Sequence, residues 1–402
     1  MVPRSNRSQS TEPAEMRQLL PTVHVRSLFL ATIGIAPLIA PWAHPGPVAA
    51  GPPAAAPVAA VELRIREPRT SSPKPAGNPY RQLEGPLSGL EERLFADAAD
   101  GQWNEHSILA AALVASGVED QRSLDDYLAR VATLVDELAR SGELTGTARQ
   151  RAQAILEFLH RRILHGGYQI DCTDLRVALD EGRFNCVSAS LLFHCIANQF
   201  GLHVEGLEAP GHAMSRLVLP DEVLDVETTC PTWFRLLDDP KRQAAMVDKA
   251  LGLSQPRSKS TAERRVVSAV ELVATIYYNR GVDLLGQREF ASAVAANARA
   301  LRLDPLNHTA EGNLLASLNN WAIAMGGAGR YPEAVRILDL GLSLDAAYPT
   351  FKTNYVHVYH QWISELLAKG EREEARLIAE QALADPFLAG EVRAAIPELS
   401  AE

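Results

Sequence analysis

The C-terminal part of the chain carries an internal repeat, and this repeat constrains the fold more than any single motif does. Three alanines, Ala293, Ala334 and Ala375, follow one another at equal intervals, each within a stretch of helical character. A unit that recurs in tandem in this way buries its apolar face against the next unit. The sequence therefore predicts stacked pairs of helices over residues 265–395.

The first unit of this array has small residues where two antiparallel helices would approach each other. Gly281 precedes Ala293, and Pro305 follows that alanine at the same distance along the chain and ends the unit. This pattern resembles a tetratricopeptide (TPR) repeat. The later units have Ala322 and Ile363 where the first has Gly281, and their period exceeds the usual ~34 residues. We therefore expect longer helices or longer connections in those units.

Composition and charge exclude several classes of function. The chain has 402 residues, of which 47% are hydrophobic, so it can bury two or three domain cores. Its net charge of −10 argues against a nucleic-acid-binding surface, which is usually basic. The sequence contains no phosphate-binding loop, no GxGxxG motif after a strand and no HExxH motif. We expect no nucleotide cofactor and no metal.

The four cysteines lie close together in the sequence, but no two of them form a CxxC motif. So few thiols in so long a chain predict neither a disulfide framework nor a zinc cluster. A single disulfide between Cys172 and Cys230 stays open if the protein is exported.

The N-terminal residues bear on the cellular compartment. Arg17 and Arg26 precede an apolar run from Leu28 to Trp42, and small residues follow it. We expect a signal peptide or an N-terminal membrane anchor over residues 1–50. The alternative is a leader without a targeting role, which would leave the protein in the cytoplasm. Residues 51–85 are rich in Pro and Ala, and we expect them to form a linker.

Residues 86–255 are expected to form one α+β domain between the linker and the repeats. Apolar residues recur at helical spacing up to about Leu164. A helix is expected from Cys186 to Phe200, ended by Gly201. Three strands are expected after it, the last two joined by a turn at residues 220–222: His203 to Leu207, His212 to Leu219 and Val223 to Thr228.

The start of the expected helix carries the residues with the clearest chemistry. A helix N-terminus favours the thiolate form of a cysteine, so the position of Cys186 activates it as a nucleophile. His212 begins the second strand and is the candidate base. His194 lies on the same helix as the thiol but about 12 Å further along its axis, so we expect it to be structural.

Two acids, Asp225 and Glu227, are candidates for orienting His212. Alternation along a strand places both on one face. A turn centred near Asp221 pairs residue 227 near Ser215, which brings Glu227 closer to His212, whereas an aspartate is the usual orienting acid in such triads. Both remain open. Tyr168 and Asn185 are candidates for stabilising an oxyanion.

These motifs together resemble a known superfamily. Phe-Asn-Cys-Val-Ser-Ala at a helix start, followed by Pro-Gly-His and Asp-Val-Glu-Thr-Thr, is similar to the transglutaminase-like cysteine hydrolases and transferases. The chain looks closest to the bacterial branch, in which the core follows a helical segment and can precede TPR repeats. The resemblance implies a papain-like α+β core followed by an all-α TPR-like domain. It also implies that Cys186, His212 and Asp225 or Glu227 form the triad.

The resemblance implies acyl transfer from an amide through a thioester, with no cofactor. Water as the acceptor gives a peptidase or amidase, and an amine gives a crosslink. The repeats would bind a protein or peptide partner, and the N-terminal segment would tether the chain to a membrane if it is not cleaved. The alternative is a non-catalytic interaction module, exported or membrane-tethered, whose core is a relic.

Overall fold

The computed structural model describes residues 78–209, 211–237, 239–250, 264–384, 389, 390 and 393. The expected signal or anchor segment, residues 1–50, and the expected linker up to residue 77 lie outside these residues. Within the part that the structure describes, no helix has the length and apolar character needed to cross a membrane.

The described chain is mostly helical and contains two small sheets, so it is α+β in the general sense. Its first part contains four helices separated by short turns, as the helical spacing up to Leu164 predicts. These helices and the two 3-10 turns beside them are η1 (Arg81–Leu83), α1 (Gly89–Asp97), η2 (Ala98–Asp100), α2 (Ile108–Ala115), α3 (Gln121–Arg140) and α4 (Ala148–Arg162).

The second part carries the sheets and one deeply buried helix. Its elements are β1 (Gly167–Tyr168), α5 (Leu175–Glu181), β2 (Arg183–Phe184), α6 (Cys186–Gln199), β3 (His203–Ala209), β4 (His212–Val218), β5 (Val223–Val226), η3 (Trp233–Leu236), α7 (Pro240–Ala250) and β6 (Arg265–Val267). The helix and the three strands predicted around the candidate site are thus confirmed to within a few residues. Gly201 ends α6 in the left-handed conformation, with φ 71°.

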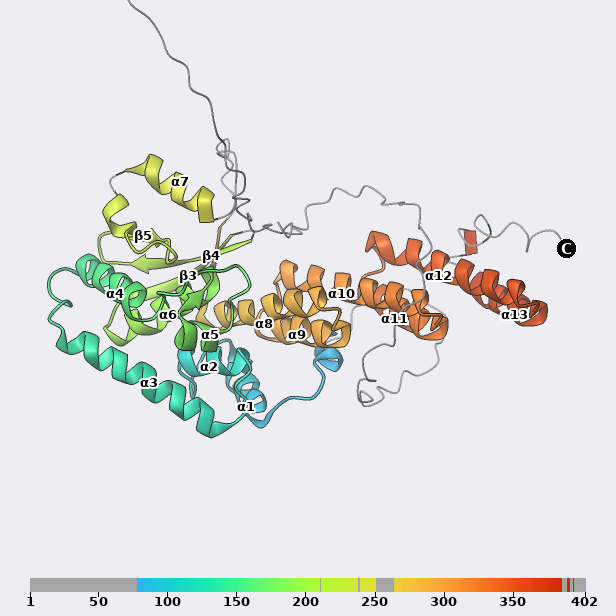
Figure 1. Cartoon of the computed structure of the whole chain (residues 1–402), viewed down its shortest axis with the longest axis horizontal. Helices are drawn as coiled ribbons and strands as arrows, with labels where there is room; N and C mark the ends of the chain where they lie inside the picture. The colour runs from blue at the N-terminus through green and yellow to red at the C-terminus, as the bar shows by residue number, and fades with distance from the viewer. Residues whose placement is uncertain are drawn as a thin grey trace, which may run out of the picture. The chain divides into compact units, whose positions relative to one another are not determined.

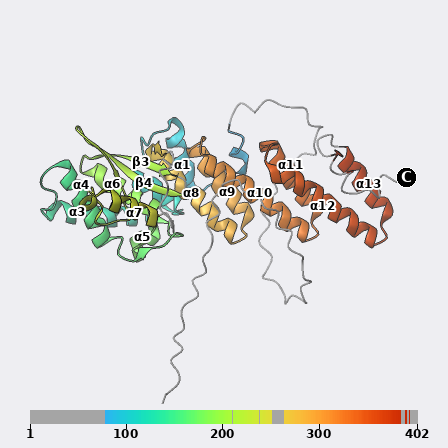
Figure 2. The ribbon, with the colours of Figure 1, turned by 90° about the horizontal axis from the view of Figure 1, so that it is seen from above.

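The main sheet is antiparallel, with the strand order β5-β4-β3-β6. Helix α6 packs against β3 and β4 (Figures 1 and 2). It is buried along most of its length, from Cys186 to Ala197. β6 lies inside the range expected for the repeats, yet it pairs with β3 and belongs to this sheet. The repeat therefore begins at α8, after the edge strand of the sheet.

The described C-terminal part consists of six helices, and each packs against the next. They are α8 (Ala269–Gly286), α9 (Phe290–Leu303), α10 (His308–Gly327), α11 (Tyr331–Leu344), α12 (Pro349–Ala368) and α13 (Arg372–Leu383). Ala293, Ala334 and Ala375 are all buried, on α9, α11 and α13. The first helices of the second and third pairs, α10 and α12, have 20 residues each. The long period is therefore accommodated in helices, and the connections stay short.

Helix packing explains the glycine at position 281 in the first helix pair, α8 and α9. A Cβ atom on Gly281 would lie 2.3 Å from Nδ2 of Asn297, which is fully buried on α9. Only a glycine lets α8 and α9 approach this closely.

The end of the expected linker is part of the folded protein. Tyr80 is buried, and its hydroxyl donates a hydrogen bond of 2.6 Å to Glu311 on α10. Glu84 is also buried and forms an ion pair of 2.8 Å with Arg302. The prediction that the linker extends to residue 85 is therefore wrong, because residues 78–85 are held by partners from the repeats, which lie far away in the sequence.

Candidate active site

Local sequence fixes the start of α6, and with it the position of the thiol. Asn185 is the N-cap residue, and its side-chain oxygen accepts hydrogen bonds from the backbone N–H groups of Val187 and Ser188, at 2.9 Å and 3.1 Å. The hydroxyl of Ser188 accepts from the N–H of Asn185 at 3.0 Å and completes a capping box. Cys186 is therefore the first residue of the helix, where unpaired N–H groups and the helix dipole attract negative charge.

Asn185 is not available as an oxyanion donor. Its side-chain nitrogen donates to the hydroxyl of Thr173 at 2.6 Å and to the carbonyl of Ile170 at 3.0 Å, which uses both of its N–H groups. Asn185 therefore has a structural role, since it ties the helix start to the loop that precedes α5.

His212 lies at the first position of β4, opposite Ala209 at the end of β3. Its Nε2 atom is 2.6 Å from Oε2 of Glu227, and both side chains are only 1% exposed. Burial lowers the pKa of His212, but the side chains of Cys186 and Glu227 outweigh burial and raise that pKa to about 10. The imidazolium form is therefore stabilised between the thiol and the carboxylate.

Among the residues that the structure describes, the second nitrogen of His212 has no hydrogen-bond partner. Nδ1 is buried and unpaired, whereas Nε2 is held by Glu227. An unpaired buried nitrogen is costly unless another group uses it. Nδ1 is therefore the ring atom that is free to take a proton from the thiol of Cys186.

The two candidate acids have different partners. Asp225 forms ion pairs with Arg216 at 2.8 Å and with Arg264 at 2.7 Å, whereas Glu227 contacts His212. The structure thus brings Glu227 to the histidine, whereas Asp225 is paired with two arginines.

The expected strand register was wrong by one residue. Asp225 pairs with Arg216, and Val226 pairs with Ser215. β5 also ends at Val226, so Glu227 lies beyond the strand and does not share a face with Asp225 through strand alternation. A shift of one residue moves every side chain to the opposite face, which explains why Asp225 faces an arginine.

Several buried or half-buried polar residues lie around Glu227, and sequence patterns do not single them out. The hydroxyl of Thr228 is 2.8 Å from the hydroxyl of Ser190 on α6, and the carbonyl of Thr228 is 2.9 Å from Nε2 of His160 on α4. Ser190 was the detectable indication, because it is a polar residue on the fully buried part of an apolar helix. These contacts hold the chain beyond β5 against the helix that carries the thiol.

Tyr168 lies beside the thiol. β1 and β2 pair in parallel with Tyr168 opposite Phe184, and the two rings meet edge to face with centroids 6.1 Å apart. Burial, followed by the proximity of Cys186 and Glu227, raises the pKa of the phenol above its ordinary value. The hydroxyl therefore remains a hydrogen-bond donor close to the sulfur, while 41% of the residue is exposed.

The other candidates in this part of the chain are structural. His194 is buried, and burial, with a smaller contribution from His203, lowers its pKa to about 4. All four cysteines are free and buried, so the disulfide between Cys172 and Cys230 does not form. Cys172 instead lies 3.4 Å from a guanidinium nitrogen of Arg183.

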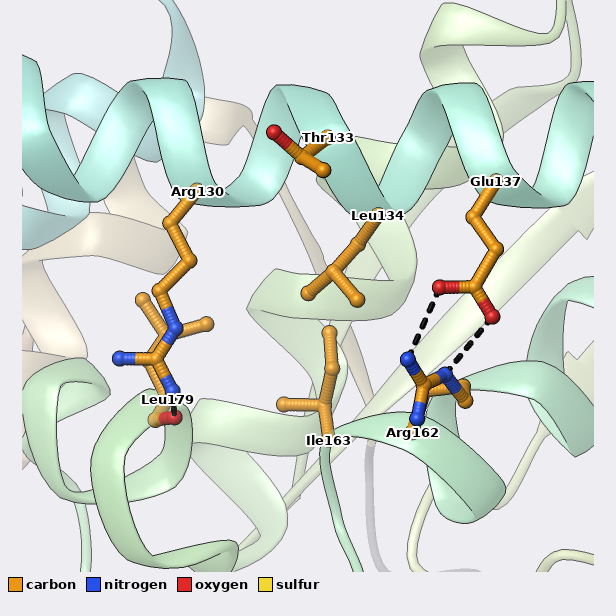
Figure 3. Close-up of a pocket in the computed structure, with 7 residues that line it drawn as sticks. All are labelled: Arg130, Thr133, Leu134, Glu137, Arg162, Ile163 and Leu179. Atoms are coloured by element: carbon orange, nitrogen blue, oxygen red, sulfur yellow. Dashed lines mark hydrogen bonds and ion pairs between the residues drawn. The ribbon is translucent and has the colours of Figure 1, made fainter.

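A pocket of about 380 Å³ lies elsewhere, between α3, α4 and α5 (Figure 3). Its floor is apolar, formed by Leu134, Ile163 and Leu179. Its two arginines are already paired: Arg162 with Glu137 and Arg130 with the carbonyl of Leu179, as the dashed lines in Figure 3 show. None of the candidate site residues lines this pocket.

Comparisons of the chain with protein-family models, with curated proteins and with solved structures found no match.

Proposed function

We propose that this protein is a cysteine acyl hydrolase or acyltransferase of the transglutaminase-like type, with Cys186 as nucleophile, His212 as base and Glu227 as the orienting acid. The observation that carries the proposal is the buried His212, which is bound to Glu227 through Nε2 and faces Cys186 with Nδ1 unpaired. His194, which is structural, also has a buried and unpaired Nδ1, so His212 is set apart by its contacts with both a thiol and a carboxylate.

The geometry supports the following sequence of steps. The proton of the Cys186 thiol first moves to Nδ1 of His212, whose raised pKa favours the imidazolium, and the sulfur then attacks the carbonyl carbon of an amide. The tetrahedral intermediate collapses, the amine leaves with the proton from the imidazolium, and a thioester remains on the sulfur. Water or an amine then attacks the thioester, regenerates the thiol and releases an acid or a new amide. The phenol of Tyr168 and the N–H of Cys186 are the donors we assign to the oxyanion.

The helical repeats would serve this chemistry by holding a protein or peptide partner. They resemble TPR repeats in the first pair of helices and in the buried alanines of all three pairs. The large apolar side chains exposed in this part of the chain are Val282, Leu306, Ile323, Leu367 and Leu377. Singly exposed apolar side chains are common on protein surfaces, so the proposed partner binding rests on the resemblance to TPR repeats.

One observation favours a second function, that of a non-catalytic partner-binding module. Cys186 is only 8% exposed, and Tyr168 lies beside its sulfur. A relic core would tolerate a covered thiol, whereas an enzyme must let an acyl group reach it. In this case Cys186→Ala would leave partner capture and phenotype intact, while changes on the repeat surface would abolish both.

Alkylation of the native protein by iodoacetamide tests the enzymatic proposal. We expect Cys186 to react first, because burial raises the pKa of Cys172 and raises that of Cys195 to about 12, while Cys230 is only 2% exposed against 8% for Cys186. His212→Ala should slow the alkylation of Cys186 by about 10²-fold, the lower end of what a positioned acid–base group contributes. Cys195→Ala is the matched control and should leave the reaction of Cys186 unchanged. If all four thiols react alike, or Cys186 is the slowest, the enzymatic proposal fails.

A further inference from the structure

The carboxylate of Glu227 is held at both of its oxygens. Oε2 binds Nε2 of His212 at 2.6 Å, while Oε1 accepts two hydrogen bonds from Thr229. One comes from the backbone N–H at 3.1 Å and the other from the side-chain hydroxyl at 2.6 Å. Thr229 therefore binds the carboxylate oxygen that the imidazole does not contact.

Glu227 needs these hydrogen bonds from Thr229 because little else fixes its side chain. β5 ends one residue earlier, so the sheet does not orient the side chain. A glutamate has three rotatable side-chain bonds, and ordering them is costly in conformational entropy. An aspartate in the same role would have one rotatable bond fewer, so the longer acid gains more from an anchor.

The residue before Thr229 is itself bound to the helix that carries the nucleophile. Thr228 contacts Ser190 through its hydroxyl, and Ser190 lies one helical turn after Cys186 on α6. The carbonyl of Thr228 is also bound to His160 on α4. Since Thr229 directly follows this fixed residue, its hydroxyl holds a defined position relative to the thiol.

We propose that Thr229 is a positioning residue, whose hydroxyl fixes the Glu227 carboxylate in the orientation that holds His212 toward Cys186. This inference rests on the proposed function of Cys186 and His212. Thr229 does not touch the reacting atoms and acts only through Glu227. The titratable groups that face His212 are Cys186 and Glu227, and Tyr168 lies close to both.

The test compares Thr229→Val with Thr229→Ser in the full-length protein. Valine keeps the shape of threonine and the backbone N–H but removes the hydroxyl, whereas serine retains the hydroxyl. The readouts are the NMR titration of the His212 ring, the rate of Cys186 alkylation by iodoacetamide and the thermal unfolding temperature. We expect Thr229→Val to move the His212 titration midpoint down by about one unit and to slow alkylation by about threefold to tenfold, the effect of losing one charge-assisted hydrogen bond.

Thr229→Ser should restore both values. A merely structural role for Thr229 would lower the unfolding temperature without moving the His212 titration, and that result would overturn the inference. If Thr229→Val does not fold, Glu227→Asp replaces it, because an acid one methylene shorter cannot reach both Thr229 and His212. An unchanged His212 midpoint in that variant would also contradict the inference. If the His212 midpoint responds as expected while wild-type Cys186 is unreactive, the proposed function fails and the role of Thr229 stands.

Discussion

Paired polar side chains that are partly or fully buried occur in two regions of the molecule, and their chemistry differs. One region is the junction, the set of ion pairs that joins the core to the first pair of repeat helices. There each arginine meets one or more carboxylates: Arg265 with Glu208, Glu271 and Asp304, Arg299 with Glu91, and Arg302 with Glu84. The other region is the candidate active site, where a histidine lies between a thiol and a carboxylate.

The difference lies in which groups can change their charge. Arginine stays protonated at any pH a protein meets, so the junction is a permanent set of charge pairs. A histidine can exchange its proton with a neighbouring group, and His212 has an imidazolium form stabilised by Cys186 and Glu227 and one buried nitrogen that is unpaired among the described residues. The charges of the junction are therefore fixed, whereas the charge of the candidate site can change by transfer of a proton.

Breaking the junction should give the largest loss of stability. Arg299 binds Glu91 at 2.9 Å and also donates to the backbone carbonyls of Glu84 and Pro86. Arg299→Met removes these bonds and leaves Glu91, a buried acid, without its cation. We expect urea denaturation to show a loss of about 3 kcal/mol in the free energy of unfolding.

The matched control is Arg376→Met on α13, where the arginine pairs with Glu373 and Glu380 at the surface. An exposed pair contributes less than about 1 kcal/mol. Neither variant should alter the rate of Cys186 alkylation. Equal losses of stability in the two variants would show that the junction is no stronger than a surface ion pair.

Glu227, which lies beyond β5, and Asp225, which lies within it, should differ in their effect on the reactivity of the Cys186 thiol. Glu227→Gln keeps the shape of the side chain but removes the charge that stabilises the His212 imidazolium. We expect the alkylation of Cys186 to slow by about 10²-fold, as when an orienting or acid–base group is lost. Asp225→Asn disturbs only the pairs with Arg216 and Arg264, and the rate should stay within about threefold of the wild type.

Iodoacetamide labelling at neutral pH measures both rates, with circular dichroism to verify that each variant is folded. Should Asp225→Asn slow the thiol as much as Glu227→Gln does, the contact between His212 and Glu227 has no special role in activating Cys186.

The elements set by local chemistry were predictable from the sequence. Asn185 caps α6, an apolar run continues it and Gly201 ends it, and all of these features are visible within one short segment of the chain. The repeat was predictable for a related reason, because its buried alanines recur at a fixed interval. In both cases the information lies within one element or one period.

The choice between the two acids was not predictable, because distant residues decide it. β5 ends where Thr228 turns to Ser190 and where the indole N–H of Trp233 donates to the carbonyl of Asp225 at 2.7 Å. The turn alone does not reveal these contacts, so the expected register was one residue off. The packing of residues 78–85 was missed for the same reason, since Glu311 and Arg302 hold that segment from a distant part of the chain.

The smallest expected difference between the two regions is in how the free energy of unfolding responds to acid, about 1 kcal/mol. Burial lowers the pKa of His194 on α6 to about 4, below the ordinary value of ~6.5 that the unfolded chain has. The unfolded state therefore binds a proton first, and stability falls as the pH drops from about 6.5 toward 4. His212 has the opposite sign: its raised pKa gives a contribution that is complete below about 6.5 and is lost as the pH rises toward about 10.

His194→Leu removes the buried titrating ring, so the loss of stability between pH 7 and pH 5.5 should shrink by roughly 1 kcal/mol. Urea denaturation at the two pH values measures this difference. Arg299→Met is the control, since it lowers stability at both values without changing the contribution of His194. If stability falls with pH equally in His194→Leu and in the wild type, His194 takes up its proton without opening the core. The pH dependence of stability would then no longer distinguish the region around α6 from the junction.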